Sequence, residues 1–318
     1  MSSFETIKKQ VYDAKAFGKV AVLLGGQYTE REISLQSGKC VLDALKARGV
    51  DAHPVDVDEN ISQVLAAGNF DRAFIALHGK GGEDGTIQGV LEYLKIPYTG
   101  SRVTASALSM DKCKTKLILQ SLGIKTPKFM ILNQATSPEA IIEKIGIPCV
   151  IKPIYEGSSF GTTIVESQEN LLAALQLAFE YDKEIMAETY IMGNEYTVGI
   201  LLEKCLPTIH ITTQRKFYDY AAKYTDETTG FHIPCGLNAV QEEKLHAIAL
   251  AVYQALGCRH WARVDVMQDQ LGEFWVLELN TIAGLTTHSL VPKMAKAVSM
   301  DFSQLILTIL AQTLEDKI

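Results

Sequence analysis

The stretch VLELNTIAGLTTHSLVP, residues 276–292, interrupts an apolar pattern in a way that decides how the chain is organised. Glu278 and Asn280 stand two residues apart at the end of an apolar run, so they share one face of an extended strand. A loop of glycine and hydroxyl residues follows, without the alternation of another strand. We expect this strand to end at a ligand site.

The preceding segment ARVDVM supplies a matching carboxylate at Asp265. If the two strands pair as a hairpin, the oxygen atoms of Asp265, Glu278 and Asn280 converge, and such oxygen sets bind hard divalent cations. Arg263 falls on the same face and suits a phosphate or an oxyanion. A solvated strand face is the simpler alternative, but the flanking residues are aliphatic: Val264, Val266, Leu277 and Leu279.

Composition and charge are those of an ordinary globular protein. The 318 residues are 47% hydrophobic and 21% charged, and the formal net charge of −7 disfavours nucleic acid as the main partner. No apolar run approaches the ~18 residues of a membrane span, and the charged N-terminus lacks a signal core. We therefore expect no membrane association and a cytoplasmic location. The six cysteines form no CxxC pair and are expected to be reduced thiols.

The first third of the chain alternates strands with helices. Predicted strands at 19–24, 51–56 and 73–77 are followed by polar or glycine-rich turns and then by helical apolar spacing. This order indicates a mostly parallel, doubly wound α/β sheet, whose ligands lie beyond the carboxyl ends of the strands. We assign residues 1–111 to this N-terminal domain, with 1–18 as an extension.

The remaining chain reads as two α+β domains, 112–191 and 192–318. In the first of them, strands at 148–152 and 162–166 flank the loop EGSSFG, and antiparallel pairing is expected. In the second, a polar and aromatic stretch at 212–234 is too long for a plain turn, and loops of this length are usually functional.

Lys152 leaves the end of a buried apolar strand just before EGSSFG. A buried lysine needs an anionic partner, and a glycine- and serine-rich loop offers N–H groups to anions, so a nucleotide phosphate is the natural candidate. Such loops are also common connections, and neither a Walker nor a Rossmann fingerprint is present. Two further motifs have simple alternatives: GGQYTEREISL around Glu30 could merely cap a helix, and Lys223 with Tyr224 could be surface packing.

Eight motifs occur in one order across nearly the whole chain, and together they resemble the D-alanine–D-alanine ligase family of the ATP-grasp superfamily. They are VLLGGQYTEREISLQSG, ALHGKGGEDGTIQG, PYTGS, SALSMDK, KPIYEGSSFG, FYDYAAKY, ARVDVM and ELNTIAGLTTHSLVP. The resemblance implies an ATP-grasp architecture, in which two α+β domains clasp ATP and D-alanine binds against the N-terminal domain. It also implies a homodimer.

The resemblance further implies an ATP-dependent ligase that joins two D-alanine molecules into D-alanyl-D-alanine through a D-alanyl phosphate, for peptidoglycan precursor synthesis. Two Mg²⁺ or Mn²⁺ ions would be held by Asp265, Glu278 and Asn280. The residues implied to bind the nucleotide are Lys112, Lys152 and Lys223 at the phosphates, Glu188 at the adenine amino group, Glu195 at the ribose, and Ile191.

Substrate-side residues are implied in the same way. Arg263 and the Gly284 backbone would stabilise the tetrahedral intermediate, and Ser289 with Leu290 would bind the second D-alanine. The residues implied around the first D-alanine are Glu30, which would orient it, Ser158 and Tyr224, which would link to Glu30, and His78 nearby.

Two residues depart from the family pattern. Ala283 stands where proline commonly precedes the glycine, and Thr189 follows Glu188 where lysine is common, so nucleotide contacts at Thr189 would use the backbone.

Two alternatives stay open: another ATP-grasp carboxylate–amine ligase with a different acceptor, and a non-catalytic nucleotide-binding protein. The motifs TEREISL and LHGKGGEDG disfavour the first, and the presence of all three metal ligands disfavours the second.

Overall fold

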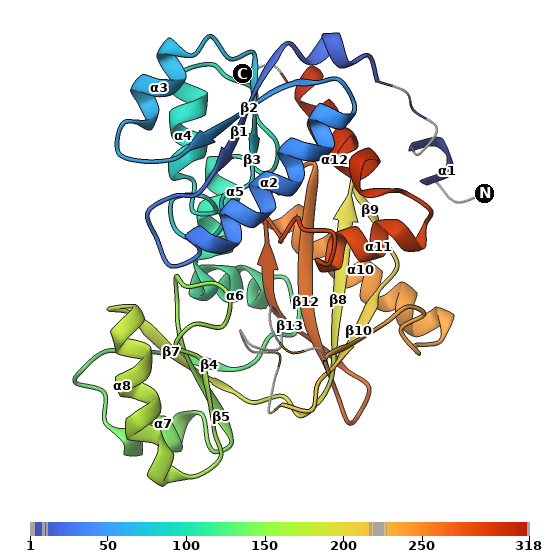
Figure 1. Cartoon of the computed structure of the whole chain (residues 1–318). Helices are drawn as coiled ribbons and strands as arrows, with labels where there is room; N and C mark the ends of the chain where they lie inside the picture. The colour runs from blue at the N-terminus through green and yellow to red at the C-terminus, as the bar shows by residue number, and fades with distance from the viewer. Residues whose placement is uncertain are drawn as a thin grey trace.

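The computed structural model describes residues 4–7, 10, 12–215, 218, 226 and 228–316. It contains a parallel sheet at the top of Figure 1, a small antiparallel sheet at the lower left and a larger antiparallel sheet on the right. The predicted N-terminal extension contributes two short elements, α1 (Phe4–Ile7) and η1 (Ala14–Phe17). Their apolar residues Phe4, Ile7 and Phe17 are buried in the main core.

The N-terminal sheet is parallel, in the order β2-β1-β3, as the alternation of strands and helices predicted. The middle strand β1 is buried over most of its length, which explains its continuous aliphatic run. Helix α2 packs against β1 and β2. The elements are β1 (Lys19–Leu24), α2 (Arg31–Ala47), β2 (Asp51–Asp56), α3 (Ile61–Ala67), β3 (Arg72–Ile75), α4 (Thr86–Tyr93) and α5 (Val103–Met110).

The central sheet is antiparallel, in the order β4-β7-β5-β6, which confirms the predicted pairing around EGSSFG. Ser137 begins α7 as predicted, because its side chain accepts a hydrogen bond from Ala140 N at 3.3 Å. The elements are α6 (Lys112–Ser121), β4 (Phe129–Leu132), α7 (Pro138–Lys144), β5 (Cys149–Pro153), β6 (Thr163–Val165), η2 (Gln168–Asn170), α8 (Leu171–Tyr181) and β7 (Ile185–Thr189).

The C-terminal sheet has the order β11-β10-β8-β12-β13, with β9 paired to β8. Part of the predicted 212–234 loop is a strand, β11. No single helix in the described ranges is long and apolar enough to cross a membrane, and α11 with α12–η3 meets the length and composition requirement only as a pair bent by 103°. The elements are β8 (Gly193–Leu201), β9 (Lys204–Cys205), β10 (Ile209–Thr212), β11 (Gly230–His232), α10 (Ala239–Ala255), β12 (Trp261–Asp269), β13 (Phe274–Asn280), α11 (Leu290–Ala297), α12 (Phe302–Ala311) and η3 (Gln312–Leu314).

The apolar cores divide the molecule unevenly. One continuous core joins the parallel sheet to the loop after β13 and to helices α11 and α12. A second core lies between the C-terminal sheet and α10. The central sheet has a core of its own, made only of residues between 132 and 187. The N-terminal and C-terminal parts are therefore packed together. The central sheet is packed mainly on itself, although α6 contributes Leu119 to the C-terminal core.

Candidate active site

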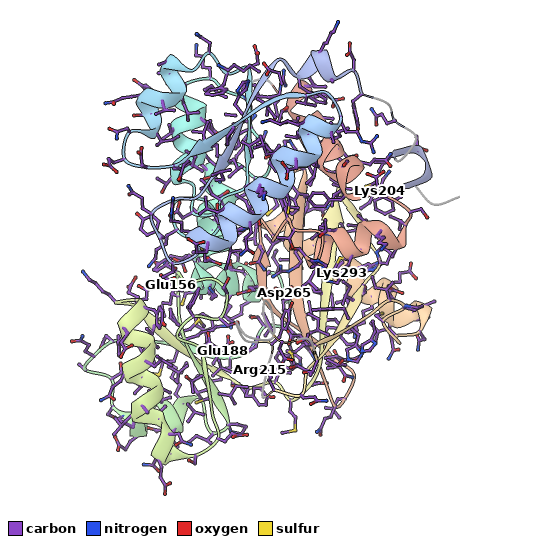
Figure 2. The ribbon with its side chains drawn as sticks, viewed as in Figure 1. Glu156, Glu188, Lys204, Arg215, Asp265 and Lys293 are labelled. Carbon is purple, nitrogen blue, oxygen red and sulfur yellow. The ribbon has the colours of Figure 1, made fainter. Side chains whose placement is uncertain are left out.

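Two adjoining cavities hold the predicted site residues. The large cavity, of about 890 Å³, lies between the parallel sheet's loops and the end of β13. The small cavity, of about 380 Å³, lies between the central and C-terminal sheets, with Glu188 on one side and Asp265 on the other (Figure 2). Lys223 and Tyr224 lie outside the described residues. All the other predicted site residues line one or both cavities: Glu30, His78, Lys112, Lys152, Ser158, Glu188, Ile191, Glu195, Arg263, Asp265, Glu278, Asn280, Gly284, Ser289 and Leu290.

The hairpin predicted from the sequence brings the three candidate metal ligands together. Asp265 on β12 pairs with Glu278 on β13, and Asn280 Nδ2 donates to Asp265 Oδ2 at 3.0 Å. The register shifts just after Asp265, and this irregularity turns both Leu277 and Glu278 toward the small cavity. No cluster of three His, Cys, Asp or Glu side chains suited to a metal occurs in the described part of the chain. Two carboxylates and an amide oxygen fit a hard divalent cation.

Arg263 is bound to Asp265 on the same strand. Its Nε and Nη2 donate to the two carboxylate oxygens at 2.8 and 2.7 Å, and Thr197 Oγ1 donates to Asp265 Oδ1 at 2.6 Å. Burial alone would lower the pKa of the Arg263 guanidinium, but the attraction of Asp265 outweighs it and leaves that pKa raised. Arg263 is therefore a fixed positive charge beside the large cavity.

Lys112 lies where the two cavities join. Its Nζ donates to the carbonyl oxygens of Ile154 and Glu156 at 3.3 and 2.6 Å, and lies 3.9 Å from Glu278 Oε2. The lysine thus fastens the start of the EGSSFG loop to α6. Its positive charge also lies near the Glu278 carboxylate on β13.

Lys152 finds its anionic partner within the protein. That partner is Glu188 on the neighbouring strand β7, whose Oε1 lies 2.5 Å from Lys152 Nζ. A second lysine, Lys116, lies 2.8 Å from Glu188 Oε2. Burial would raise the pKa of Glu188, but the two lysines outweigh it and hold that pKa below its usual value. Glu188 is therefore a charged acceptor at the wall of the small cavity, which Ile191 and Glu195 also line.

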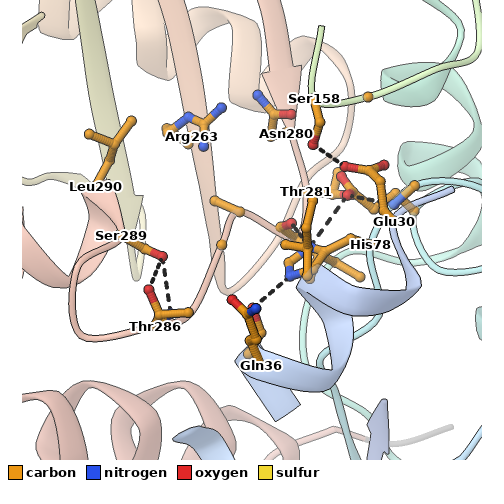
Figure 3. Close-up of a pocket in the computed structure, with 18 of the residues that line it drawn as sticks. Glu30, Gln36, His78, Ser158, Arg263, Asn280, Thr281, Thr286, Ser289 and Leu290 are labelled. Carbon is orange, nitrogen blue, oxygen red and sulfur yellow. Dashed lines mark hydrogen bonds and ion pairs between the residues drawn. The ribbon is translucent and has the colours of Figure 1, made fainter. Parts of the chain in front are cut away.

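Glu30 links the N-terminal domain to the EGSSFG loop. It is 5% exposed and stands at the N-cap position of α2, but its side chain makes no capping hydrogen bond to the helix. Its Oε1 accepts a hydrogen bond from Ser158 Oγ (Figure 3). A Cβ at Gly79 would lie 2.2 Å, and one at Gly157 2.5 Å, from Glu30 Oε2. A side chain at either position would therefore have to displace the Glu30 carboxylate.

His78 and Ser37 connect α2 to the loop after β13. Ser37 Oγ lies 2.8 Å from His78 Nε2, and His78 Nδ1 lies 3.2 Å from the Ile282 carbonyl oxygen. Leu285 N also donates to Ser37 Oγ at 3.4 Å. The contacts hold the loop after Asn280 against the N-terminal domain. Ser37 was not among the predicted site residues, although a hydroxyl on the buried face of a helix was a usable signal.

The N-terminus of α11 borders the large cavity. Ser289 precedes the helix, and its Oγ accepts from Thr286 N at 3.0 Å and lies 2.9 Å from Thr286 Oγ1 (Figure 3). A Cβ at Gly284 would lie 3.0 Å from Ser289 Oγ, so the Gly284 backbone passes close to the Ser289 side chain. Leu290 is the first helical residue. A hydroxyl beside unpaired helix N–H groups suits a carboxylate.

Three residues that we call the Glu156 bridge were missed by the sequence prediction. Lys80 Nζ lies 2.6 Å from Glu156 Oε1, and Thr29 Oγ1 donates to Glu156 Oε2 at 3.0 Å. Lys80 and Thr29 belong to the N-terminal domain, and Glu156 begins the EGSSFG loop. Because the partners are far apart in the sequence, no local pattern reports the contact.

Comparisons with known proteins identify the family of the chain. A family model described as D-ala D-ala ligase N-terminus matches residues 60–101, and one described as D-ala D-ala ligase C-terminus matches residues 118–311. The D-alanine–D-alanine ligase of Ectopseudomonas mendocina (strain ymp) is 51% identical over 303 residues, which are 95% of this chain and 97% of the relative. The chain belongs to the D-alanine–D-alanine ligase family. The ligase of Acinetobacter baumannii (strain ACICU) is 49% identical over 306 residues, covering 95% of this chain and 98% of that relative.

Solved structures of ligases share the fold. The D-alanine–D-alanine ligase of Bacillus anthracis complexed with ATP has a TM-score of 0.82 and 35% identity, covering 93% of this chain and 97% of that one. The VanG D-Ala:D-Ser ligase of Enterococcus faecalis has a TM-score of 0.79 and 32% identity, covering 93% and 99%. The predicted ATP-grasp fold class is therefore confirmed. Both departures from the family pattern fall at the cavities, Ala283 at the large one and Thr189 at the small one.

Proposed function

We propose that the protein is an ATP-dependent ligase that joins two D-alanine molecules into D-alanyl-D-alanine and releases ADP and phosphate, for peptidoglycan precursor synthesis. The observation that carries the proposal is that the two cavities share Lys112, Ser158 and Glu278 in their walls. A carboxylate in the large cavity is therefore next to the phosphate end of a nucleotide in the small cavity.

The small cavity suits ATP. Its walls carry aliphatic side chains for the base together with charged groups for the sugar and phosphates. The proposed contacts are Glu188 with the adenine amino group, Ile191 beside the base, Glu195 with the ribose, Lys112 and Lys152 with the phosphates, and Lys223 with the γ-phosphate.

The first step is phosphoryl transfer. A carboxylate oxygen of the first D-alanine attacks the γ-phosphorus, the bond to the β-phosphate oxygen breaks, and D-alanyl phosphate and ADP form. Glu30, held by Ser158, would accept the ammonium group of this D-alanine and so aim its carboxylate. Asp265, Glu278 and Asn280 would hold the two Mg²⁺ or Mn²⁺ ions. When bound, these ions neutralise charge on the transferred phosphoryl group.

The second step is amide formation. The amine of the second D-alanine, after losing its proton, attacks the acyl carbon, and phosphate leaves. Arg263 and the Gly284 N–H would stabilise the oxyanion. Ser289 and Leu290 at the start of α11 would bind the second carboxylate. Water must be excluded because an acyl phosphate hydrolyses, and the Glu156 bridge keeps the EGSSFG loop closed over the junction.

The test is an assay of purified protein with ATP, Mg²⁺ and D-alanine, in which phosphate release is followed and the dipeptide is identified by mass spectrometry. We expect phosphate release that depends on D-alanine, equals dipeptide formation, and is absent with L-alanine. D-serine supplied with D-alanine tests a different acceptor, as in the D-Ala:D-Ser ligase with the same fold. No phosphate release with D-alanine, or a mixed dipeptide as the main product, would contradict the proposal.

Three broader parts of the proposal follow from the family. The domains are 1–111 on the substrate side, 112–191 as the central ATP-grasp domain and 192–318 as the catalytic domain. We propose a homodimer, which sedimentation of the full chain measures. We also propose action in the cytoplasm, where ATP is available.

A further inference from the structure

Lys116 is a fully buried lysine that no motif singled out. Its side chain, in the middle of α6, is 0% exposed and lines neither cavity. Its Nζ lies 2.8 Å from Glu188 Oε2, donates to Thr126 Oγ1 at 2.8 Å and lies 5.9 Å from the centre of the Phe129 ring. Desolvation disfavours a buried charge unless it is paired and hydrogen-bonded. Glu188 is therefore the charged group that balances and contacts Lys116.

The two lysines at Glu188 differ in access. Lys152 binds Oε1 and lines the small cavity, whereas Lys116 binds Oε2 from the protein interior. Thr126 Oγ1, which accepts from Lys116, donates to the Val276 carbonyl oxygen on β13 at 2.9 Å. Lys116 is thus fixed by contacts that involve α6, β7 and β13. Lys152, by contrast, lines the small cavity, where its ammonium group can leave the Glu188 carboxylate and bind a phosphate of ATP instead.

We propose that Lys116 is a positioning residue for adenine recognition, which keeps Glu188 charged and in place as an acceptor for the exocyclic amino group when Lys152 turns to the phosphates. The inference rests on the proposed function, because it takes the small cavity as the ATP site. Burial lowers the pKa of Lys116 to about 8, and the ammonium group is still mostly charged at neutral pH. Hypoxanthine has a carbonyl oxygen in place of the amino group, and a carboxylate acceptor would repel it.

The test replaces Lys116 with methionine in the full chain and measures ATP and ITP binding by isothermal titration calorimetry, with the KM values for ATP and D-alanine. We expect K116M to weaken ATP binding by about 10- to 100-fold and to lower the preference for ATP over ITP similarly. The KM for D-alanine should stay within about twofold, because Lys116 is remote from the large cavity. A folded K116M with unchanged ATP affinity and purine preference would overturn the proposal.

The matched control is K125M, because Lys125 is a nearby lysine whose side chain is 49% exposed and pairs with Glu273 on the surface. It should bind both nucleotides like the wild type, and an equal loss in K125M would overturn the proposal. The double variant K116M/E188Q removes the buried charges of Lys116 and Glu188 together. Comparing it with E188Q tests the proposal even if K116M does not fold. The double variant should have the ATP-to-ITP ratio of E188Q, since Lys116 acts through Glu188. A further loss in the double variant would overturn the proposal.

Calorimetry also separates this inference from the reaction itself. A wild-type protein without D-alanine-dependent phosphate release would refute the proposed reaction alone. The calorimetric comparison of the wild type with the four variants would still decide the role of Lys116, because binding requires no turnover.

Discussion

The C-terminal domain and the central domain meet the rest of the molecule in different ways. The C-terminal domain shares an apolar core with the parallel sheet, through residues such as Trp261, Leu285 and Ile306. The central sheet keeps its own core. Its EGSSFG loop reaches the N-terminal domain through the Glu156 bridge and the contact of Ser158 with Glu30.

Because of this difference, the site combines a part that is fixed to the parallel sheet with a part that is packed separately from it. Ser289 and Gly284 stand next to residues of the shared core, Leu290 and Leu285, and are therefore fixed relative to the N-terminal part. The central sheet carries Lys152 and Glu188, and its EGSSFG loop reaches the N-terminal part through polar contacts, which are weaker and can re-form. An ATP-grasp ligase must admit ATP and then exclude water, and a separately packed domain is suited to that movement.

The largest expected effect is at the β12–β13 hairpin, the part of the site that should not move. D265N should lower kcat by about 10³-fold, because it weakens a proposed ligand of the metal ions that would stabilise the transferred phosphoryl group. Steady-state assays at saturating Mg²⁺ measure it, and the melting temperature serves as the control for folding. Turnover of D265N near the wild-type rate would remove Asp265 from the metal site.

Two core variants test the division of the cores directly. Ile306 lies in the shared core and Ile151 in the central core, and both are fully buried. I306A and I151A should each cost about 2–5 kcal/mol of local stability. In calorimetry and hydrogen exchange, I306A should destabilise the N-terminal and C-terminal parts together, and I151A the central domain alone. If both variants lowered the stability of a single common unfolding transition equally, the two cores would not be independent.

The Glu156 bridge is expected to have a moderate effect. K80M should raise the KM for D-alanine by about tenfold, because the loop that carries Ser158 loses a charged contact worth roughly 1.4 kcal/mol. R48M is the matched control, since Arg48 pairs with Asp301 in an exposed contact, 3.0 Å long, within the shared-core part. If K80M and R48M have the same KM as the wild type, the bridge does not hold the loop.

The smallest effect is expected at Ala283, where the family commonly has proline. Ala283 is buried beside the fixed part of the large cavity, and the change removes no group that we place in the reaction. A283P should therefore change kcat and both KM values by less than about twofold, within the range of neutral substitutions. A tenfold loss would show that this backbone differs from that of the family.

The sequence predicted features carried by adjacent segments. The β12–β13 hairpin, its convergent polar side chains and the shared face of Arg263 and Asp265 follow from alternation on two neighbouring strands. The ion pair between Arg263 and Asp265 was not predicted. The register shift after Asp265 did not follow, because alternation assumes a regular strand. The pairing of Lys152 with Glu188 was also unexpected, because the anionic partner predicted for Lys152 was a nucleotide phosphate. Lys116 was overlooked, although it falls on the same buried face of α6 as Cys113 and Leu119.

The central claim is that D-alanine is activated as an acyl phosphate at the junction of the two cavities. The most direct measurement supplies D-alanine labelled with ¹⁸O in its carboxylate, together with ATP and Mg²⁺, and analyses the released phosphate by mass spectrometry. The account predicts one ¹⁸O atom in each phosphate, because the carboxylate oxygen that attacks the γ-phosphorus leaves with it. Released phosphate without ¹⁸O, alongside normal dipeptide formation, would contradict the account.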